Sequence, residues 1–149
     1  MTVLFSRKCE YAIQGLLYLA EHRQGGAVPA EAIARDLGIS RDFISKTLQG
    51  LVAEGLVASH RGKAGGFLLN RAPKAITLLE VVLIIDGSNL FENCVLGLPE
   101  CGSDNACPVH GIWGPLREQI RSMLAATTLD QFQDVDTTLE SLVQNAIHA

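Results

Sequence analysis

The sequence predicts a mostly helical protein with one small β-hairpin, arranged as a winged helix-turn-helix domain followed by a long helix. Two short helical patterns joined by a glycine-containing turn, over residues 29–55, are typical of a helix-turn-helix. Two β-favouring runs then flank a basic, glycine-rich tip, over residues 56–69, which indicates a hairpin or wing. A chain of 149 residues is long enough to bury a core of its own.

The first helix is predicted from about Ser6 to Arg23. Ser6 is a favourable N-cap residue, and Gln24-Gly25-Gly26 ends the helical pattern. Apolar residues recur in this segment at the i, i+3, i+4, i+7 spacing of one helix face: Ile13, Leu16, Leu17 and Ala20.

The second and third helices follow with little chain between them. Pro29 opens the second helix at its first turn, where proline is tolerated, and Gly38 ends it as a C-cap. Ser40 can cap the third helix, which Gly55 stops. The apolar stripe of the third helix is Ile44, Leu48, Leu51 and Val52.

Two further helices are predicted after the hairpin. Thr77 can cap a fourth helix, Leu78 to Ile85, which is apolar on most sides and is therefore expected to be buried. A longer helical pattern begins at Trp113 or Pro115 and ends near Thr127-Thr128. Residues 129–149 are expected to form short helical pieces or a frayed tail.

The chain divides into three regions of different charge and pattern. Residues 1–75 form the winged helix-turn-helix region, residues 76–112 the buried helix and a cysteine loop, and residues 113–149 the long helix and tail. The first 75 residues carry ten Lys and Arg against six Asp and Glu, whereas the remaining residues carry two against ten. This asymmetry predicts that only the first half meets a polyanion.

The third helix and the hairpin tip carry the residues expected to contact DNA. A recognition helix reads base edges from its N-terminal turns, and the outward face here is Ser40, Arg41, Asp42, Ser45, Lys46 and Gln49. The wing offers Arg61 and Lys63, beside Gly65 and Gly66, on a turn narrow enough to approach phosphates or the minor groove.

Three cysteines and a histidine lie in a segment without helical or strand periodicity: Cys94, Cys101, Cys107 and His110. Thiolates and imidazole are ligands of iron–sulfur clusters or zinc. The C-x6-C-x5-C-x2-H spacing lacks the close C-x-x-C pairs of structural zinc sites, so zinc is less favoured. Cys9 lies apart in the first helix, where a small core residue is expected, and a redox or ligand role is left open.

No enzyme is predicted, because the sequence contains no phosphate-cradling glycine loop joined to a helix, no triad and no paired carboxylates in a recognisable setting. No apolar stretch approaches the length of a membrane span. No signal-peptide cleavage site follows the first apolar run cleanly. These features predict a cytoplasmic protein whose thiols stay reduced.

The combination of motifs resembles the Rrf-two family of winged-helix transcriptional regulators, with its IscR-like and NsrR-like members. The resemblance is carried by Lys8-Cys9-Glu10-Tyr11-Ala12, by the helix-turn-helix, and by the wing segment from Gly55 to Phe67. The three cysteines before Trp113 and the segment Thr127-Thr128-Leu129 complete it.

The resemblance implies a homodimer that binds a pseudo-palindromic operator in double-stranded DNA, with the long helix as the dimerisation helix. It also implies that Cys94, Cys101 and Cys107 hold an iron–sulfur cluster, of two or four irons. In IscR-like members the fourth ligand is a histidine in the C-x2-H position, which His110 occupies here. In other members it is a carboxylate from the first helix of the partner subunit, and Glu10 stands at that place. The signal would be iron–sulfur status, nitric oxide or redox state.

Two alternatives belong to other classes. One is a metal-free regulator in which Cys9 or a pair of loop cysteines forms disulfides, so that DNA binding follows oxidant rather than iron. The other is a small iron–sulfur or zinc protein that does not bind DNA. A steep dependence of DNA affinity on salt would exclude the second alternative.

Overall fold

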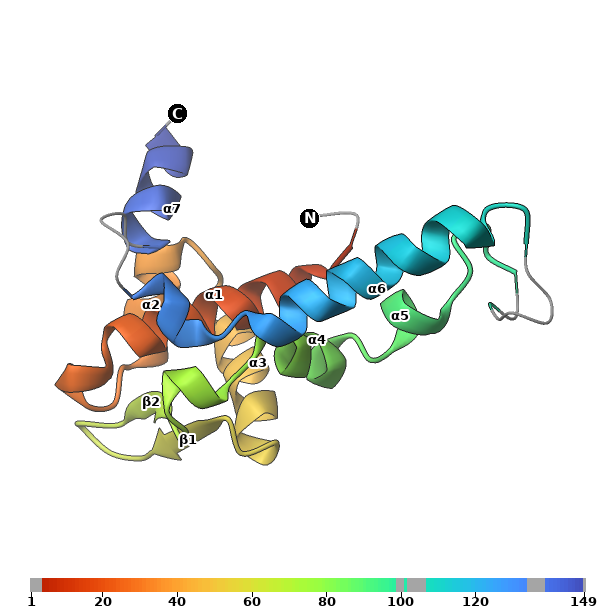
Figure 1. Ribbon diagram of the computed structural model, residues 1–149. Coiled ribbons are helices and arrows are strands. Elements are labelled where there is room, and N and C mark those ends of the chain that lie inside the picture. The colour runs from red at the N-terminus through yellow and green to blue at the C-terminus, as the bar shows by residue number, and fades with distance from the viewer. Residues whose placement is uncertain (1–3, 99–100, 102–106, 134–138, 149) are drawn as a thin grey trace.

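The computed structural model describes residues 4–98, 101, 107–133 and 139–148. Helices dominate it, with one two-stranded antiparallel sheet, as the sequence predicts (Figure 1). In chain order the elements are α1 (Arg7–Glu21), η1 (Arg23–Gly25), α2 (Ala30–Leu37), α3 (Arg41–Ala53), β1 (Val57–His60), β2 (Gly66–Leu69), η2 (Pro73–Ala75), α4 (Leu78–Ile85), α5 (Asn89–Glu92), α6 (His110–Ala126), η4 (Leu129–Phe132) and α7 (Leu139–His148).

The predicted caps define most of the helix ends. The Ser6 hydroxyl accepts from the Cys9 backbone N–H at 3.1 Å, and the Thr77 hydroxyl accepts from the Glu80 N–H at 3.2 Å. Gly38 ends α2 in the left-handed conformation, with φ of 63°. Ser40 occupies the N-cap position of α3, but its side chain makes no capping hydrogen bond, which leaves the exposed hydroxyl available to other partners.

The hairpin is anchored to the helix-turn-helix by a third extended segment. β1 pairs with β2 in the register Val57↔Leu69 to His60↔Gly66. On the other edge of β2, Phe67 and Val28 exchange two backbone hydrogen bonds of 2.8 Å each. Gly66 makes this approach possible, because its φ is +147° and an added Cβ would lie 2.2 Å from the Val28 carbonyl oxygen.

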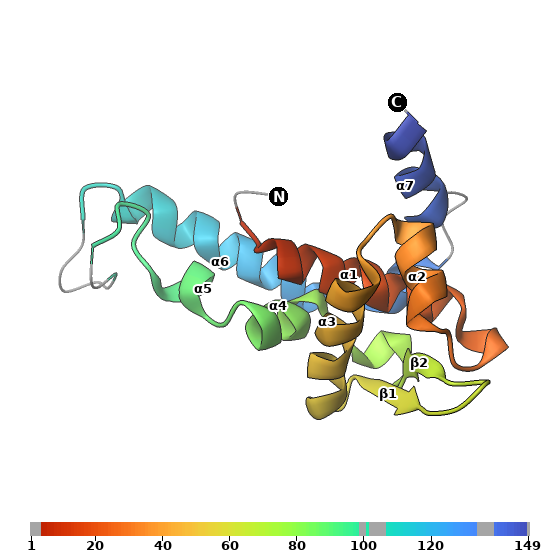
Figure 2. The ribbon, with the colours of Figure 1, turned by 180° about the vertical axis from the view of Figure 1, so that it is seen from behind.

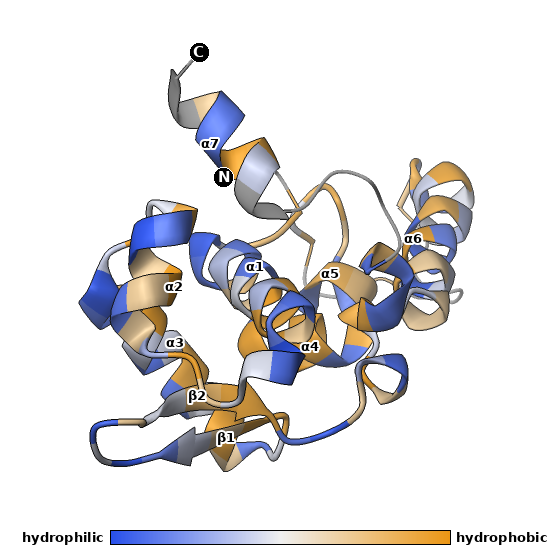
Figure 3. Ribbon diagram, turned by 90° about the vertical axis from the view of Figure 1, so that its left-hand side faces the viewer, coloured by the Kyte–Doolittle hydropathy of each residue, from blue (hydrophilic) through white to orange (hydrophobic). Residues whose placement is uncertain are grey.

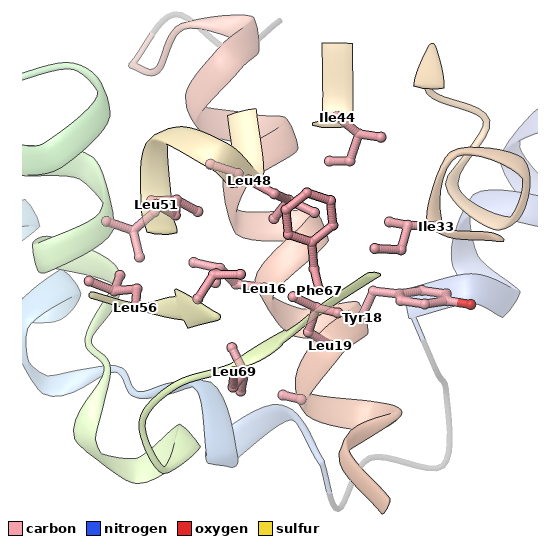
Figure 4. Close-up of a cluster of buried hydrophobic side chains, with 14 of the residues drawn as sticks. Leu16, Tyr18, Leu19, Ile33, Ile44, Leu48, Leu51, Leu56, Phe67 and Leu69 are labelled. Carbon is pink, nitrogen blue, oxygen red and sulfur yellow. The ribbon is translucent and has the colours of Figure 1, made fainter. Parts of the chain in front are cut away.

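The main core lies between α1, α2, α3 and the hairpin (Figure 4). Each fully buried leucine in it contributes roughly 1.5–3 kcal/mol to folding. Gly15 lets α3 pack closely on α1, since a Cβ there would lie 3.1 Å from the Ile44 Cδ1 atom. Figure 4 labels ten of the buried side chains that gather in this core: Leu16, Tyr18, Leu19, Ile33, Ile44, Leu48, Leu51, Leu56, Phe67 and Leu69.

A second cluster joins α1 to α4, α5 and α6. Its buried members are Cys9, Val82, Phe91 and Leu124. The expectation that α4 is buried is wrong in part: only Val81 and Val82 are fully buried, and Leu83 is 37% exposed. Figure 3 shows apolar residues along α4, whose neighbours α1 and α6 cover only part of that surface.

Two helix boundaries after the hairpin differ from the sequence-based expectation. The short helix α5 was not predicted, and α6 begins at His110 rather than at Trp113 or Pro115. Gly111, Gly114 and Pro115 are poor helix formers, so the early part of α6 lacks a helical signature. Contacts with the segment before Cys94, described below, hold it in the helical conformation.

The tail contains one helix, α7, which packs on α2 and α1. The Gln144 side chain donates to the Asp36 carbonyl at 3.4 Å. The rest of the predicted tail, residues 134–138, and residues 99–100 and 102–106 of the cysteine loop lie outside the described residues. Within the described ranges, no helix combines the length and the apolar character needed to cross a membrane.

Candidate functional site

The outward face of α3 is open to solvent over its first turns (Figure 2). Exposed side chains there are Ser40, Arg41, Asp42, Lys46 and Gln49, with Ser45 half-buried among them. Arg41 makes only loose ion pairs, at 3.9 Å with Glu31 and 4.0 Å with Asp42, and is itself 64% exposed. The predicted residues therefore share one accessible face of a helix, the element that the major groove of DNA admits.

The wing lies on one flank of this face. Gln49 Nε2 and Ser59 Oγ are 3.5 Å apart, which ties α3 to β1. Arg61 and Lys63 are exposed at the tip, where the Gly65 N–H closes a tight turn onto the Gly62 carbonyl at 3.0 Å. Gly65 and Gly66, predicted as DNA contacts, lie at the base of the tip, and contacts with neighbouring backbone explain why they lack side chains.

The cysteine segment brings its four candidate ligands together as two pairs. Cys94 Sγ lies 3.5 Å from Cys107 Sγ, and Cys101 Sγ lies 3.3 Å from His110 Nδ1. Among the residues that the structure describes, no three His, Cys, Asp or Glu side chains converge on a single metal point. The arrangement is thus bipartite, with a thiol pair beside a thiol–imidazole pair.

The distances within each pair fit ligands of a tetrahedral metal. Two thiolates on one tetrahedral ion lie roughly 3.8 Å apart, and a thiolate and an imidazole nitrogen roughly 3.5 Å, for bonds of about 2.3 and 2.0 Å. The pKa of Cys94 is lowered, chiefly by a hydrogen bond from the Leu96 backbone, with further contributions from the Cys107 and Cys101 thiols, against an opposing effect of burial. A lowered pKa favours the thiolate, which is the form that binds metal.

The segment before Cys94 is fixed to α6. The Asn93 carbonyl accepts hydrogen bonds from Trp113 Nε1 and from Arg117 Nη1, both at 3.2 Å. The His110 N–H donates to the Cys107 carbonyl at 3.0 Å, so a turn from Cys107 to His110 leads into α6. Sequence reasoning missed Asn93, whose role depends on its carbonyl and therefore leaves no side-chain signature.

Glu10, the alternative fourth ligand, is not brought to the cysteines within one chain. It lies on α1, half-buried, with Oε2 3.9 Å from Arg7 Nη1. Figures 1 and 2 both place the described part of the cysteine segment at the far end of α6, away from α1. Glu10 would therefore reach a cysteine loop only from a second copy of the chain.

Cys9 is a buried residue next to a carboxylate. Burial is the largest effect that raises its pKa to about 12, and the charge and hydrogen bond of Asp86 add to it. Asp86 in turn accepts from the Ser6 N–H at 2.8 Å and from the Ser6 hydroxyl. These contacts join the start of α1 to the end of α4 and support the expected core role of Cys9.

We expect Cys9 to resist alkylation in the folded protein. A pKa of about 12 instead of 9.0 leaves roughly 1,000-fold less thiolate at neutral pH, and thiolate is the reactive form. Iodoacetamide at pH 7.5, followed by mass spectrometry, should label the loop cysteines of metal-free protein long before Cys9. Addition of urea should abolish the difference, whereas equal labelling rates in native buffer would contradict this assignment.

Comparison with known proteins places the chain in a family. The model of the Rrf2 family, described as an iron-dependent transcriptional regulator, matches residues 5–134. The chain belongs to the Rrf2 family. Among curated relatives, the HTH-type transcriptional regulator IscR of Yersinia pestis is 35% identical over 133 residues, which cover 89% of this chain and 80% of that protein.

Solved structures agree with the Rrf2 assignment. IscR of T. potens has a TM-score of 0.69 at 25% identity, covering 98% of this chain and 88% of that one. CymR of B. subtilis, the global cysteine regulator, has a TM-score of 0.74 at 24% identity, covering 89% and 97%. Likeness to CymR shows the fold alone.

The Rrf2 assignment confirms the winged-helix fold, DNA binding and the expectation that the chain is not an enzyme. The chain is a transcriptional regulator of the Rrf2 type. A small iron–sulfur or zinc protein that does not bind DNA is thereby excluded.

Proposed function

We infer that this Rrf2 regulator controls transcription through an iron–sulfur cluster held by Cys94, Cys101, Cys107 and His110. The observation that carries the proposal is the pairing of these ligands, at 3.5 Å between the two sulfurs and 3.3 Å between sulfur and Nδ1. Two pairs of ligands suit a two-iron cluster, in which each iron takes two protein ligands. Such a cluster would supply one-electron chemistry and reactivity toward oxygen or nitric oxide.

The chain is proposed to act as a homodimer joined through α6. Ile112, Leu116 and Met123 on that helix are 74%, 48% and 53% exposed, and their spacing places them on one helix face, so that they form an apolar stripe. A second copy packed along this face would bury them and place two recognition helices on one pseudo-palindromic operator. Sedimentation should give twice the mass of the 16.0 kDa chain.

Signal transmission would start where the cysteine segment meets α6. Trp113 and Arg117 hold Asn93, the residue before Cys94, and the Cys107 carbonyl accepts from the N–H of His110, the first residue of the helix. A change in how the thiols are ligated would alter order at both ends of the loop and so shift α6 against its partner. A coupling on the order of 1–3 kcal/mol would change operator affinity from several-fold to about a hundredfold.

His110 is the proposed fourth ligand, because its Nδ1 atom already lies 3.3 Å from the Cys101 sulfur in the same chain. His110→Ala should therefore shift the visible absorption spectrum and make the cluster more labile, since ligand identity tunes both properties. Glu10→Gln should leave the spectrum of the purified protein unchanged. The reverse pattern would assign the fourth ligand to Glu10 of the partner subunit.

The proposal is tested on protein purified without oxygen. Iron, zinc and acid-labile sulfide per chain should be measured with the visible spectrum, and operators should be selected from genomic fragments with the same sample. Equal iron and sulfide with a broad visible band, together with operator affinity that changes on exposure to nitric oxide or oxygen, would support the proposal. Colourless protein that fails reconstitution would refute the cluster, and zinc in its place would indicate a zinc site.

A metal-free thiol switch is the second candidate, favoured by the 3.5 Å separation of Cys94 and Cys107. Oxidation of this pair by a peroxide would join the two sulfurs, reduce the peroxide to water and close a loop. This candidate predicts iron-free protein whose operator affinity follows peroxide and recovers with a thiol reductant. The Cys94–Cys107 disulfide would be found by peptide mapping.

A further inference from the structure

The start of α1 carries two cations on the flank of α3 that lies opposite the wing. Figure 2 shows the start of α1 on one side of α3 and the strands β1 and β2 on the other. Arg7 and Lys8 are both exposed there, and the Arg7 side chain is 55% exposed. Neither residue belongs to the DNA-contact set predicted for the recognition helix and the wing.

An aromatic contact holds this end of α1 against the recognition helix. The Tyr11 and Phe43 rings meet edge to face, with centroids 5.3 Å apart. Phe43 and Gln49 are six residues apart on α3 and therefore point about 120° away from each other around its axis. Since Gln49 faces the wing through Ser59, Phe43 marks the opposite flank.

The geometry of α1 directs both cations toward that flank. The Arg7 guanidinium lies over the Tyr11 ring, 5.8 Å from its centroid. Lys8, Tyr11 and Gly15 share one side of α1 at the i, i+3, i+7 spacing, and both Tyr11 and Gly15 face α3. Lys8 thus extends the α3-facing side of α1 by one turn beyond the contact.

Of the two cations, only Arg7 makes an ion pair among the residues that the structure describes, which leaves the Lys8 ammonium open to solvent. Glu10 Oε2 is 3.9 Å from Arg7 Nη1, well beyond the 2.7–2.9 Å of a strong charge-assisted hydrogen bond. Asp86 is engaged by the Ser6 N–H and hydroxyl. Ser6 also accepts from the backbone N–H groups of Cys9 and Glu10. A ligand at this flank would therefore meet the side chains of Arg7 and Lys8 rather than those two amides.

We propose that Arg7 and Lys8 form a second phosphate-binding element of this regulator, which grips the DNA backbone on the side of the recognition helix away from the wing. The occupant is duplex DNA, since these cations continue the face formed by α3 and the wing. The wing residues Arg61 and Lys63 would then hold the backbone on one side and Arg7 and Lys8 on the other. Such contacts fix register and add affinity without reading sequence.

The test compares matched substitutions of lysine. Lys8→Gln removes a cation from the proposed element, Lys63→Gln removes one from the wing, and Lys74→Gln removes one from η2. Figures 1 and 2 place η2 on the face opposite α3, so Lys74→Gln is the control for charge alone. Arg7→Gln and the double variant of Arg7 and Lys8 complete the set. Lys8→Arg retains the charge and controls for other effects of replacing Lys8.

The readout is the affinity of the full-length protein for a random-sequence 30-base-pair duplex, measured by fluorescence anisotropy from 50 to 200 mM KCl. Each lost phosphate contact should make the log–log salt slope shallower by about 0.9, and the double variant should lose roughly 12-fold less affinity across that range than the parent protein. Lys8→Arg and Lys74→Gln should keep the parental slope. Thermal melting by circular dichroism checks that each variant is folded.

The outcomes separate this inference from the proposed function. Suppose that Lys63→Gln makes the salt dependence of affinity shallower while the Arg7 and Lys8 variants behave like Lys74→Gln. The wing would then be supported as a phosphate contact, and the second phosphate-binding element would be refuted. If the parent protein showed no salt-dependent binding to the duplex, both the second phosphate-binding element and the DNA-binding part of the proposed function would be refuted. Failure of the proposed iron–sulfur cluster would leave this comparison intact, because the duplex assay uses every variant in the same ligation state.

Discussion

Replacing Cys107 with alanine is expected to abolish iron–sulfur cluster binding while leaving the helix-turn-helix core folded. Cys107 supplies one thiol of the Cys94–Cys107 pair, and no other described cysteine lies as close to Cys94. Its side chain is only partly buried and touches no member of the main core. Iron and sulfide per chain should fall to background, the visible band should disappear, and the thermal midpoint of metal-free protein should be nearly unchanged.

The matched control is Cys9→Ala. It removes a thiol from the same chain but from the cluster of buried residues between α1, α4, α5 and α6. This variant should retain iron, sulfide and colour, and should lose stability because a buried side chain is truncated. Full iron content in Cys107→Ala would overturn the assignment of the loop as the cluster site. Loss of iron in Cys9→Ala would indicate that a fourth thiol takes part.

Operator binding provides the functional half of the same experiment. If the cluster sets DNA affinity, Cys107→Ala should behave like the metal-free parent protein and should no longer respond to nitric oxide or oxygen. An affinity and a response equal to those of the parent would remove the cluster from the mechanism, whatever its iron content. A metal-free thiol switch would then be the favoured mechanism, provided that peroxide alters the affinity of the protein for its operator.

The sequence predicted the helices correctly where the residues at the helix ends and the spacing of the apolar residues indicate the same element. Ser6 and Thr77 cap helix starts with their hydroxyl groups, and Gly38 ends a helix because it lacks a side chain. All three lie at helix ends in the structure, as predicted. The recognition helix is similarly explicit, because its apolar stripe leaves one polar face outward. Local signals of this kind need no knowledge of the rest of the chain.

The features that the sequence did not reveal depend on contacts between distant segments. α6 begins at His110 in spite of Gly111 and Pro115, because Asn93 is bound by Trp113 and Arg117. Cys94 pairs with Cys107, although Cys101 is closer to it in the sequence. This pairing depends on the path of the loop and not on the spacing of the cysteines along the chain. The order of ligands along a chain predicts which residues take part but not which of them are neighbours.

Gly65 and Gly66 show how one pattern can carry two meanings. A glycine pair on a basic hairpin indicates close approach to a ligand, and for that reason both are predicted as DNA contacts. The structure supplies another close approach, that of the Val28 and His60 backbones. These two explanations differ in their consequences for stability, and substitution at Gly66 distinguishes them.

Gly66→Ala is expected to destabilise the protein severely. An added Cβ would lie 2.2 Å from the Val28 carbonyl oxygen, and the φ of +147° is unfavourable for any residue with a side chain. Relief of the overlap requires Val28 to move away from β2 and breaks its two hydrogen bonds with Phe67. Backbone strain and two lost hydrogen bonds together amount to roughly 3–5 kcal/mol, measured by urea unfolding at fixed protein concentration.

Gly62→Ala is the matched control for that measurement. Gly62 also has a positive φ, of +100°, but no heavy atom lies within 4 Å of the place that an added Cβ would take, so only backbone strain of about 1–2 kcal/mol applies. A clear excess loss at Gly66 would show that the contact with Val28, and not the backbone angle alone, requires glycine there. Equal losses at the two positions would mean that the wing is not held by Val28, and Gly66 would again be explained best by approach to DNA.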